Sequence, residues 1–221
     1  MSTHLVLDFD STIVTLESLD ELAAMALEGR RDRDEVLARI RSITDAGMDG
    51  SLPIDQSLSQ RLALLRFDRA MVRRLIDRLH HAVSPSLLAH AKELREGADR
   101  VWVVTSGFHE WIDPVVGALG IERSHVRANR LLWSGDGEVL GLDPSSELAS
   151  PRSKPRAVRA LGLSGRVIAV GDGITDWEIR DDGAAHEFIA FTETAERSSV
   201  VSRADHIARD FGAVMLRWHA S

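Results

Sequence analysis

The sequence predicts an α/β fold, in which a parallel sheet is interrupted after its first strand by an inserted helical segment. Three short apolar runs support this prediction: Leu5–Leu7, Val101–Val104 and Val167–Val170. Such runs, separated by helical stretches, are typical of parallel strands buried on both faces. The stretch Glu17–His81, between the first two runs, contains no strand-like run. With 221 residues, the chain has room for one large domain or for one domain with an insert.

Each of the three runs ends at a polar cluster. The clusters are Asp8–Thr12, Thr105–Gly107 and Gly171–Gly173. In an open parallel sheet, ligands bind beyond the carboxyl ends of the strands. We therefore expect the three clusters to meet at one edge of the sheet.

The stretch between the first two strands favours helices. Ser18 and Glu21 have the spacing of a capping box, which indicates a helix start. Further helices are expected over Asp34–Asp45, Ile54–Leu65 and Ala70–Leu79. Inserted at this point of the chain, these helices would lie as a cap over the sheet edge where the clusters meet.

The remaining elements follow from local signals. Pro85 should begin the next helix, because proline prefers early helical positions. A hairpin is expected where Asn129–Trp133 and Glu138–Leu142 flank Ser134–Gly137. Later helices are expected over Trp111–Leu119, Pro155–Leu161 and Thr175–Asp181, and weaker strands over Phe188–Phe191 and His206–Ala208.

The composition excludes several kinds of chemistry and partner. The chain has no cysteine and no tyrosine, which excludes disulfides, thiolate nucleophiles, cysteine zinc sites and tyrosine acids. Its 27 basic and 34 acidic residues give a net charge of −7, so we expect no nucleic-acid partner. The longest apolar run, Leu22–Leu27, is too short to cross a bilayer, so no membrane association is expected. The N-terminus lacks a basic leader, and we expect a cytoplasmic monomer or homodimer.

Four carboxylates are expected at the shared sheet edge. Asp8 and Asp10 lie two residues apart and would share one face of a strand. Paired carboxylates attract a cation, and one can act as a nucleophile while the other transfers protons. Asp172 and Asp176 add two more oxygen donors, the ligands that Mg²⁺ prefers. Taken singly, each pair could instead be a solvated turn or a helix cap.

Two further groups could hold an anion at this edge. Thr105–Gly107 offers a hydroxyl and backbone N–H groups near a helix start, although it could be an ordinary strand-to-helix turn. Lys154 lies beside Pro155 at an expected helix N-terminus, where a cation costs about 0.3–1 kcal/mol. A bound anion would remove this conflict. Alternatively, Lys154 belongs to a solvated basic face.

Two residues of the inserted segment could read a charged substrate. Helical geometry places Arg61 at or inside the apolar sector defined by Ile54, Leu58 and neighbouring leucines. An arginine there needs an anionic partner, which could be a substrate carboxylate or an internal acid. Glu17 precedes the first helix, where it could also serve helix electrostatics alone. Among the nine histidines, His109 is the one close to a polar cluster.

These residues together resemble the four ordered motifs of the haloacid dehalogenase (HAD) superfamily. Within this superfamily, the chain is similar to phosphoserine phosphatases over nearly its whole length. The stretches that carry the resemblance are Asp8–Glu17, Gln60–Leu64, Thr105–Gly107, Ala128–Leu131, Lys154 and Gly171–Glu178. The resemblance implies a Rossmann-like core formed by residues 1–14 and 83–221, and a helical cap formed by residues 15–82.

The resemblance also implies catalytic roles. Asp8 would attack phosphorus and form an aspartyl-phosphate. Asp10 would protonate the leaving serine oxygen and then deprotonate the hydrolytic water. Mg²⁺ would be bound by the carboxylate of Asp8, the main-chain carbonyl of Asp10 and the carboxylate of Asp172, with Asp176 in support. The implied product is L-serine.

Substrate recognition is implied in the same way. Thr105 and Lys154 would hold phosphoryl oxygens. Glu17 would bind the ammonium group of the substrate, and Arg61 its carboxylate. The other residues implied to line the substrate site are Met48, Ser106, Gly107 and Thr175.

The chain departs from the family pattern at a few positions. Ser106 stands where glycine is usual, Ile54 where some members have phenylalanine, and Asp49 adds a charge beside Met48. These departures bear on how tightly serine is selected. The alternatives are a phosphotransferase acting on an alcohol such as homoserine, a phosphatase for another small phosphomonoester, and a non-enzymatic phospho-acceptor. The acid two residues after the acceptor, Asp10, favours hydrolysis.

Overall fold

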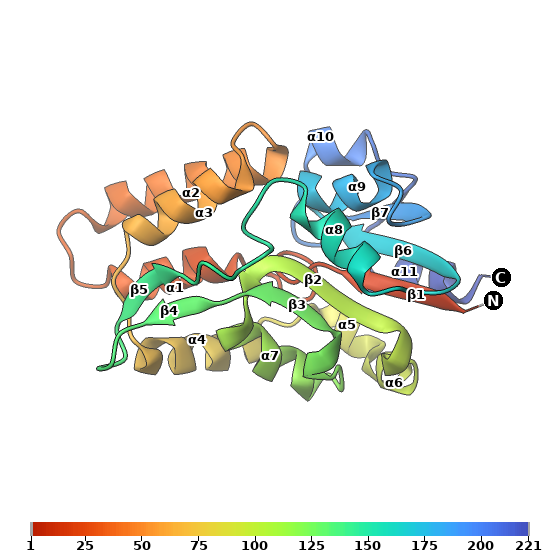
Figure 1. The fold of residues 1–221 in the computed structure, drawn as a ribbon, viewed down its shortest axis with the longest axis horizontal. Helices are drawn as coiled ribbons and strands as arrows, with labels where there is room; N and C mark the ends of the chain where they lie inside the picture. Colours follow the sequence, from red (N-terminus) through yellow and green to blue (C-terminus); the bar gives the residue numbers. More distant parts are fainter. Residues whose placement is uncertain (1, 221) are drawn as a thin grey trace.

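A computed structural model describes residues 2–220 and contains a central six-stranded sheet (Figure 1). The strand order is β3-β2-β1-β6-β7-β8, and every neighbouring pair is parallel. The strands are β1 (Thr3–Leu7), β2 (Val101–Phe108), β3 (Val126–Asn129), β6 (Arg166–Gly171), β7 (Glu187–Phe191) and β8 (His206–Ala208). The predicted α/β class is therefore confirmed.

The central strands are buried on both faces. Leu5 and Leu7 of β1 belong to one apolar cluster, whereas Val6 between them belongs to another on the opposite face. This alternation follows from the two-residue period of a strand. It explains why the strands appear in the sequence as short continuous apolar runs.

Helices cover the two faces of the sheet. The larger apolar cluster includes residues of α5 (Pro85–Ala89), α6 (Ala91–Glu96), α7 (His109–Ala118) and α11 (Phe211–His219). The smaller cluster includes residues of α8 (Ser153–Ala160), α9 (Ile174–Asp181) and α10 (Ser198–Val201). Two short 3₁₀ turns, Ala98–Arg100 and Arg123–His125, precede β2 and β3. No helix within residues 2–220 is long and apolar enough to cross a membrane.

Four helices are inserted between β1 and the rest of the sheet. They are α1 (Ser18–Ala26), α2 (Arg33–Asp49), α3 (Ile54–Ala63) and α4 (Arg69–His81). Figure 1 shows α2 and α3 lying together on one side of the molecule, while α4 packs against α1 and the core helix α7. The chain leaves and returns side by side, because Thr15 N–H donates to the Ala82 carbonyl and Ser84 N–H to the Ile13 carbonyl, both at 2.8 Å.

The expected hairpin is confirmed and bonds to the inserted helices. It consists of the antiparallel strands β4 (Leu131–Trp133) and β5 (Val139–Leu142). Val139 N–H donates to the Phe67 carbonyl at 3.0 Å, and Arg69 N–H to the Gly137 carbonyl at 3.2 Å. The ring of Phe67 meets that of Trp133 edge-on. The hairpin thus anchors the loop that joins α3 to α4.

Two expectations about local structure are wrong. Helix α1 begins at Ser18, but its side chain makes no capping hydrogen bond and instead donates to Asp10. Glu17 is the N-cap residue, so Ser18 lies one residue inside the helix, and its hydroxyl oxygen accepts the indole N–H of Trp111 instead of a backbone N–H. The stretch Asn129–Trp133 is divided, because Asn129 pairs with β2 and ends β3 while only the last three residues enter the hairpin.

Glu187, at the start of β7, joins four elements of the core. Its carboxylate accepts hydrogen bonds from Arg166 of β6 (2.9 Å from Nε) and Arg217 of α11 (2.6 Å), and His206 of β8 lies 3.2 Å away. Burial alone would raise the pKa of Glu187, but the bonds from Arg217 and Arg166 outweigh it and hold the pKa below the ordinary 4.5. The ionised form therefore stabilises the fold at neutral pH.

We predict that Glu187→Gln lowers the free energy of unfolding at about pH 7 by about 1–2 kcal/mol, as expected for partly buried ionic hydrogen bonds. Because the native pKa of Glu187 is depressed, its contribution to stability is fully present above pH 4.5 and is lost as the pH falls through the native pKa. Urea unfolding at a series of pH values measures the difference. Glu28→Gln, at an exposed position, is the control, and a difference that does not shrink toward acid would contradict the linkage.

Candidate active site

Asp8 lies directly after β1, between the two strands that flank it in the sheet. Its N–H donates to the Val170 carbonyl at 2.9 Å, which continues the pairing of β1 with β6. Its Oδ1 accepts the N–H of Phe9 at 2.8 Å. The carboxylate is buried at the sheet edge, where the order of connection reverses and a ligand site is expected.

Lys154 lies beside Asp8 and is itself almost fully buried. Its Nζ is 3.0 Å from Asp8 Oδ1 and 2.7 Å from Asp176 Oδ1. Burial alone would lower the pKa of Lys154, but the charges of Asp176 and Asp8 outweigh this effect and raise the pKa above its ordinary value. The ammonium group therefore remains charged. Of the two alternatives raised by the sequence, the solvated basic face is wrong for this residue.

Asp10 is held away from this lysine by the first turn of α1. Its two carboxylate oxygens accept the N–H of Ser18 at 3.1 Å and the hydroxyl of Ser18 at 2.9 Å. The indole of Trp111 donates to the same hydroxyl at 2.9 Å. Burial, together with the charges of Glu17 and Asp8, raises the pKa of Asp10 well above its ordinary value. A carboxyl group that keeps its proton more readily is suited to donate it to a leaving group.

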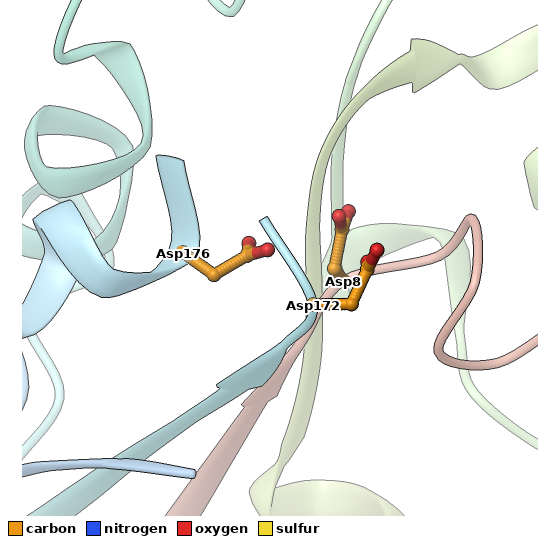
Figure 2. A group of neighbouring side chains, drawn as sticks. All are labelled: Asp8, Asp172 and Asp176. Atoms are coloured by element: carbon orange, nitrogen blue, oxygen red, sulfur yellow. The ribbon is translucent and has the colours of Figure 1, made fainter. Parts of the chain in front are cut away.

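Three carboxylates gather where a cation could bind. Figure 2 shows Asp8, Asp172 and Asp176, each of which offers an oxygen within 4.8 Å of the others. Asp172 Oδ1 is buried and has no hydrogen-bond partner within residues 2–220. An unpaired buried oxygen is costly unless a ligand satisfies it. The donor set, three hard oxygens, fits a divalent cation such as Mg²⁺.

The carboxylate of Asp10 does not belong to this group, because Ser18 binds both of its oxygens. The sequence expectation concerned its main-chain carbonyl, and that contact stays a prediction. Asp176 is already engaged by Lys154 and by the N–H of Gly173 at 3.1 Å. Both oxygens of Asp176 are thus in use, whereas Asp8 is engaged through Oδ1 and Asp172 through Oδ2, so each of these two keeps one oxygen for a metal.

Thr105–Gly107 forms the last part of β2, and α7 begins only at His109. The cluster therefore belongs to the strand itself, and the helix expected over Trp111–Leu119 begins two residues earlier, at His109. The N–H of Gly107 donates to Thr105 Oγ1 at 3.1 Å. A Cβ at Gly107 would come within 2.7 Å of Ile112 Cδ1, so a larger residue here would require the Ile112 side chain to move.

One cavity brings the predicted substrate residues together. It lies between the sheet edge and the inserted helices, and its lining includes Glu17, Met48, Arg61, Thr105, Ser106, Gly107, Lys154 and Thr175 as well as Asp8 and Asp10. His109 does not line it. Its Nδ1 is bonded to Asp113 at 2.7 Å, which supports a packing role.

Arg61 has the internal acidic partner that was one of the two alternatives left open by the sequence, and its binding of a substrate carboxylate stays a prediction. The side chain is buried, with Nη1 3.1 Å from Thr44 Oγ1 and 3.7 Å from Asp20 Oδ1, so it has an internal acidic partner. Its Nε donates to the Ser57 carbonyl at 3.3 Å. A guanidinium has five N–H donors. The N–H donors of Arg61 that are not used in these contacts are available to a ligand in the cavity, which Arg61 lines.

Sequence analysis missed Arg197, which lies directly before α10. Its guanidinium forms an ion pair with Asp172 through Nη1, and its Nη2 is 3.8 Å from Glu17 Oε1. Glu17 also accepts the hydroxyl of Ser11 at 2.8 Å. Burial raises the pKa of Glu17 even though Ser11 and Arg197 act against it. The late position of Arg197 in the chain, outside any motif, gave no signal that it belongs to this site.

The fold and the four ordered clusters define the class of this protein. The chain belongs to the family of haloacid dehalogenase-like hydrolases, which matches residues 5–179. Similar proteins include the chloroplastic phosphoserine phosphatase of Arabidopsis thaliana, 31% identical over 94% of this chain and 69% of its own length. The phosphoserine phosphatase of Homo sapiens is 30% identical over 92% of this chain and 88% of its own length.

Solved structures agree with these relatives. A phosphoserine phosphohydrolase-like protein from Francisella tularensis subsp. tularensis SCHU S4 has a TM-score of 0.88 at 27% identity, covering 98% of this chain and 99% of that one. A phospho-aspartyl intermediate analogue of phosphoserine phosphatase has a TM-score of 0.80 at 27% identity, with the same coverage of 98% and 99%. The resemblance expected from the sequence is confirmed.

We predict that a divalent cation stabilises the wild-type chain and that Asp172→Asn removes most of this effect. A ligand at 100 times its dissociation constant adds about 2.7 kcal/mol to the stability, so the melting temperature should rise clearly. Thermal unfolding with Mg²⁺, and with a chelator in its place, measures the difference. Asp99→Asn, at an exposed position, should respond to the cation as wild type does. An unchanged response of Asp172→Asn would refute the assignment of the metal group.

Proposed function

We propose that this chain hydrolyses O-phospho-L-serine to L-serine and phosphate through an aspartyl-phosphate on Asp8, in a Mg²⁺-dependent reaction. The observation that carries the proposal is one cavity lined by the buried Asp8–Lys154 pair and by Glu17 and Arg61. The phosphoserine phosphatases among its relatives support the same activity.

The reaction needs two transfers of the phosphoryl group. In the first, a carboxylate oxygen of Asp8 bonds to phosphorus as the bond from phosphorus to the serine oxygen breaks, and Asp10 gives its proton to that oxygen. In the second, Asp10 takes a proton from water, whose oxygen bonds to phosphorus and releases Asp8. Asp10 is thereby returned to its protonated state.

The residues around Asp8 are suited to hold the phosphoryl group. The buried ammonium of Lys154 and the hydroxyl of Thr105 would bind its oxygens, and the amide of Ser106 would add a donor. Gly107 would line the site, because its own N–H is bonded to Thr105 Oγ1. Mg²⁺, held by Asp8, Asp172 and the main chain of Asp10 and supported by Asp176, would neutralise negative charge during transfer. Strict dependence on the cation follows, because the acidic side chains at this edge otherwise repel a phosphate.

The other end of the substrate would be read by residues of opposite charge. Glu17 would bind the ammonium group, and Arg61 would use its unoccupied N–H donors to bind the carboxylate. Met48 and Thr175 would complete the lining. This pairing fits the zwitterionic end of a phosphorylated amino acid better than it fits a simple phosphomonoester.

We also propose that residues 15–82 act as a cap on a core formed by residues 1–14 and 83–221. The adjacent crossing segments at Thr15–Ala82 and Ile13–Ser84 support this division, because movement there would displace the inserted helices together. The packing of α4 on α7 shows that part of the insert also contacts the core. A cytoplasmic location, a monomeric or homodimeric state and the lack of nucleic-acid and membrane partners stay predictions.

Phosphotransfer to an alcohol such as homoserine ranks second. That alternative rested on Ser106, whose hydroxyl donates to the Leu148 carbonyl at 3.4 Å and so has a partner within the protein. Nothing in this contact favours an alcohol over water. A non-enzymatic phospho-acceptor ranks last, since the chain belongs to a family of hydrolases and Asp10 lines the same cavity as Asp8.

We predict that Asp8→Asn lowers kcat by at least about 10³-fold, because a carboxamide is a far poorer nucleophile toward phosphorus. Rapid acid quench with labelled phosphoserine should trap an acid-stable, alkali-labile phosphoenzyme in wild type and none in the variant. Asp99→Asn is the control. Free phosphate should carry the label in wild type, and label appearing on added homoserine would instead support the transferase.

We predict that Glu17→Gln raises KM for phosphoserine by about 10–100-fold, because it removes the charge opposite the ammonium group. Hydrolysis of p-nitrophenyl phosphate, which has no ammonium group, should change by less than about twofold. Assays with phosphoserine, phosphothreonine and simple phosphomonoesters in Mg²⁺ measure the selectivity. Equal kcat/KM values across the wild-type panel would rule out phosphoserine as the selected substrate.

A further inference from the structure

The strand that carries the phosphoryl-binding residues is irregular where it meets its outer neighbour. Val104 of β2 pairs with Arg127 of β3, and the next pair is Phe108 with Asn129. Strand β2 therefore advances four residues while β3 advances two. Thr105, Ser106 and Gly107 stand opposite Ala128 alone, and such a bulge removes backbone groups from the regular ladder.

The side chain of Asn129 bonds to the backbone that the bulge exposes. Asn129 is fully buried, and its Nδ2 donates to the Ser106 carbonyl at 2.8 Å. The opposite orientation of the amide would place two acceptors against each other, so this assignment of Nδ2 is chemically required. Its Oδ1 is buried and has no partner within the described part of the chain. Asn129 thus makes this hydrogen bond through Nδ2 although its Oδ1 remains unsatisfied.

The bond to Ser106 also fixes the direction of the next N–H. A trans peptide is planar, with its carbonyl and its N–H on opposite sides. When the Ser106 carbonyl is held by Asn129, the N–H of Gly107 must point the other way, where it donates to Thr105 Oγ1 at 3.1 Å. Because Thr105 Oγ1 accepts this bond, its own proton is free to be donated elsewhere, and Thr105 lines the cavity.

We propose that Asn129 is a positioning residue for phosphoryl binding, which acts through the Ser106–Gly107 peptide to aim the Thr105 hydroxyl proton into the cavity. This inference rests on the proposed function in so far as the group bound there is a phosphoryl group. Asn129 touches no substrate. Its effect should therefore fall on phosphate affinity and on kcat, and should leave the reading of the amino-acid end unchanged.

The test compares Asn129→Asp, which cannot donate to the Ser106 carbonyl when ionised, with Asn129→Leu, which cannot donate to it at any pH. We expect each variant to lower kcat by about 10–100-fold. Loss of a donor that contacts the transition state directly lowers kcat by about 10²–10³-fold, and an indirect effect should not exceed the low end of that range. The dissociation constant for inorganic phosphate, measured by calorimetry in Mg²⁺, should rise by about 10-fold, while product inhibition by L-serine stays within about twofold. Asn129→Ser, which keeps a short donor, should recover part of the loss.

A double-mutant cycle with Thr105→Val tests the route of the effect. If Asn129 acts through the Thr105 hydroxyl, Asn129→Asp should add less than about twofold in the Thr105→Val background. Arg127→Gln, a change on β3 two residues earlier, controls for general disturbance of this strand, and thermal unfolding controls for folding.

The inference would be overturned if Asn129→Asp and Asn129→Leu kept kcat and phosphate affinity near the wild-type values. It would also be overturned if the variants lost phosphate binding and L-serine binding equally, or if their effects multiplied fully with the effect of Thr105→Val. Failure of the proposed function is distinguishable, because it would show as a wild-type chain that binds phosphate but does not hydrolyse phosphoserine. In that case, phosphate titration of the Asn129 variants would still test whether Asn129 positions the phosphate-binding groups. A wild-type chain that binds no phosphate would overturn both.

Discussion

The buried ion pairs of Lys154 are the interaction on which the rest of the site depends. Asp8 and Asp176 come from segments more than 160 positions apart, and both carboxylates lie within 3.0 Å of the same ammonium nitrogen. Removing one partner of a buried pair leaves an uncompensated charge, which costs about 3–5 kcal/mol. The end of β1, the start of α8 and the start of α9 are therefore held in one arrangement, and the catalytic carboxylate is positioned by the same contact.

The sheet order explains how so many charges can be gathered without disturbing the core. Because β1 lies between β2 and β6, the chain passes the same edge after each of these strands. The polar residues sit just beyond the apolar part of each strand, so none interrupts the two hydrophobic clusters. Besides Lys154, the site contains a second cationic side chain, Arg197, which follows β7 in the chain and pairs with Asp172. The negative charge that the sequence alone suggested for this edge is thus partly compensated by the protein itself.

Most strands and the inserted helices could be predicted from local pattern, and the meeting of Asp8, Thr105 and Asp172 from the shared edge of parallel strands. Met48 and Thr175 were expected in the cavity only because of the family resemblance. Strand β3 could not be predicted, because Val126–Asn129 has two half-buried residues at its centre and no clear alternation. Arg197 and the Ser18–Asp10 bond could not either. Both contacts join segments that only the tertiary fold brings together, so no local sequence pattern indicates them.

Recognition of the two ends of the substrate is divided between separate parts of the chain. The phosphoryl end would meet Lys154 and the Thr105–Gly107 bulge, which are fixed by the sheet and its neighbouring helices. The amino-acid end would meet Arg61, which is held by Thr44 and Asp20 within the inserted helices. A change such as Ser106 therefore bears on phosphoryl binding, and a change such as Ile54 bears on side-chain selection. The two ends are linked at Glu17, which lies beside Arg197, the ion-pair partner of Asp172, and whose charge helps to raise the pKa of Asp10. A change at Arg61 or Ile54 can therefore alter the choice of substrate more independently of the reaction than a change at Glu17.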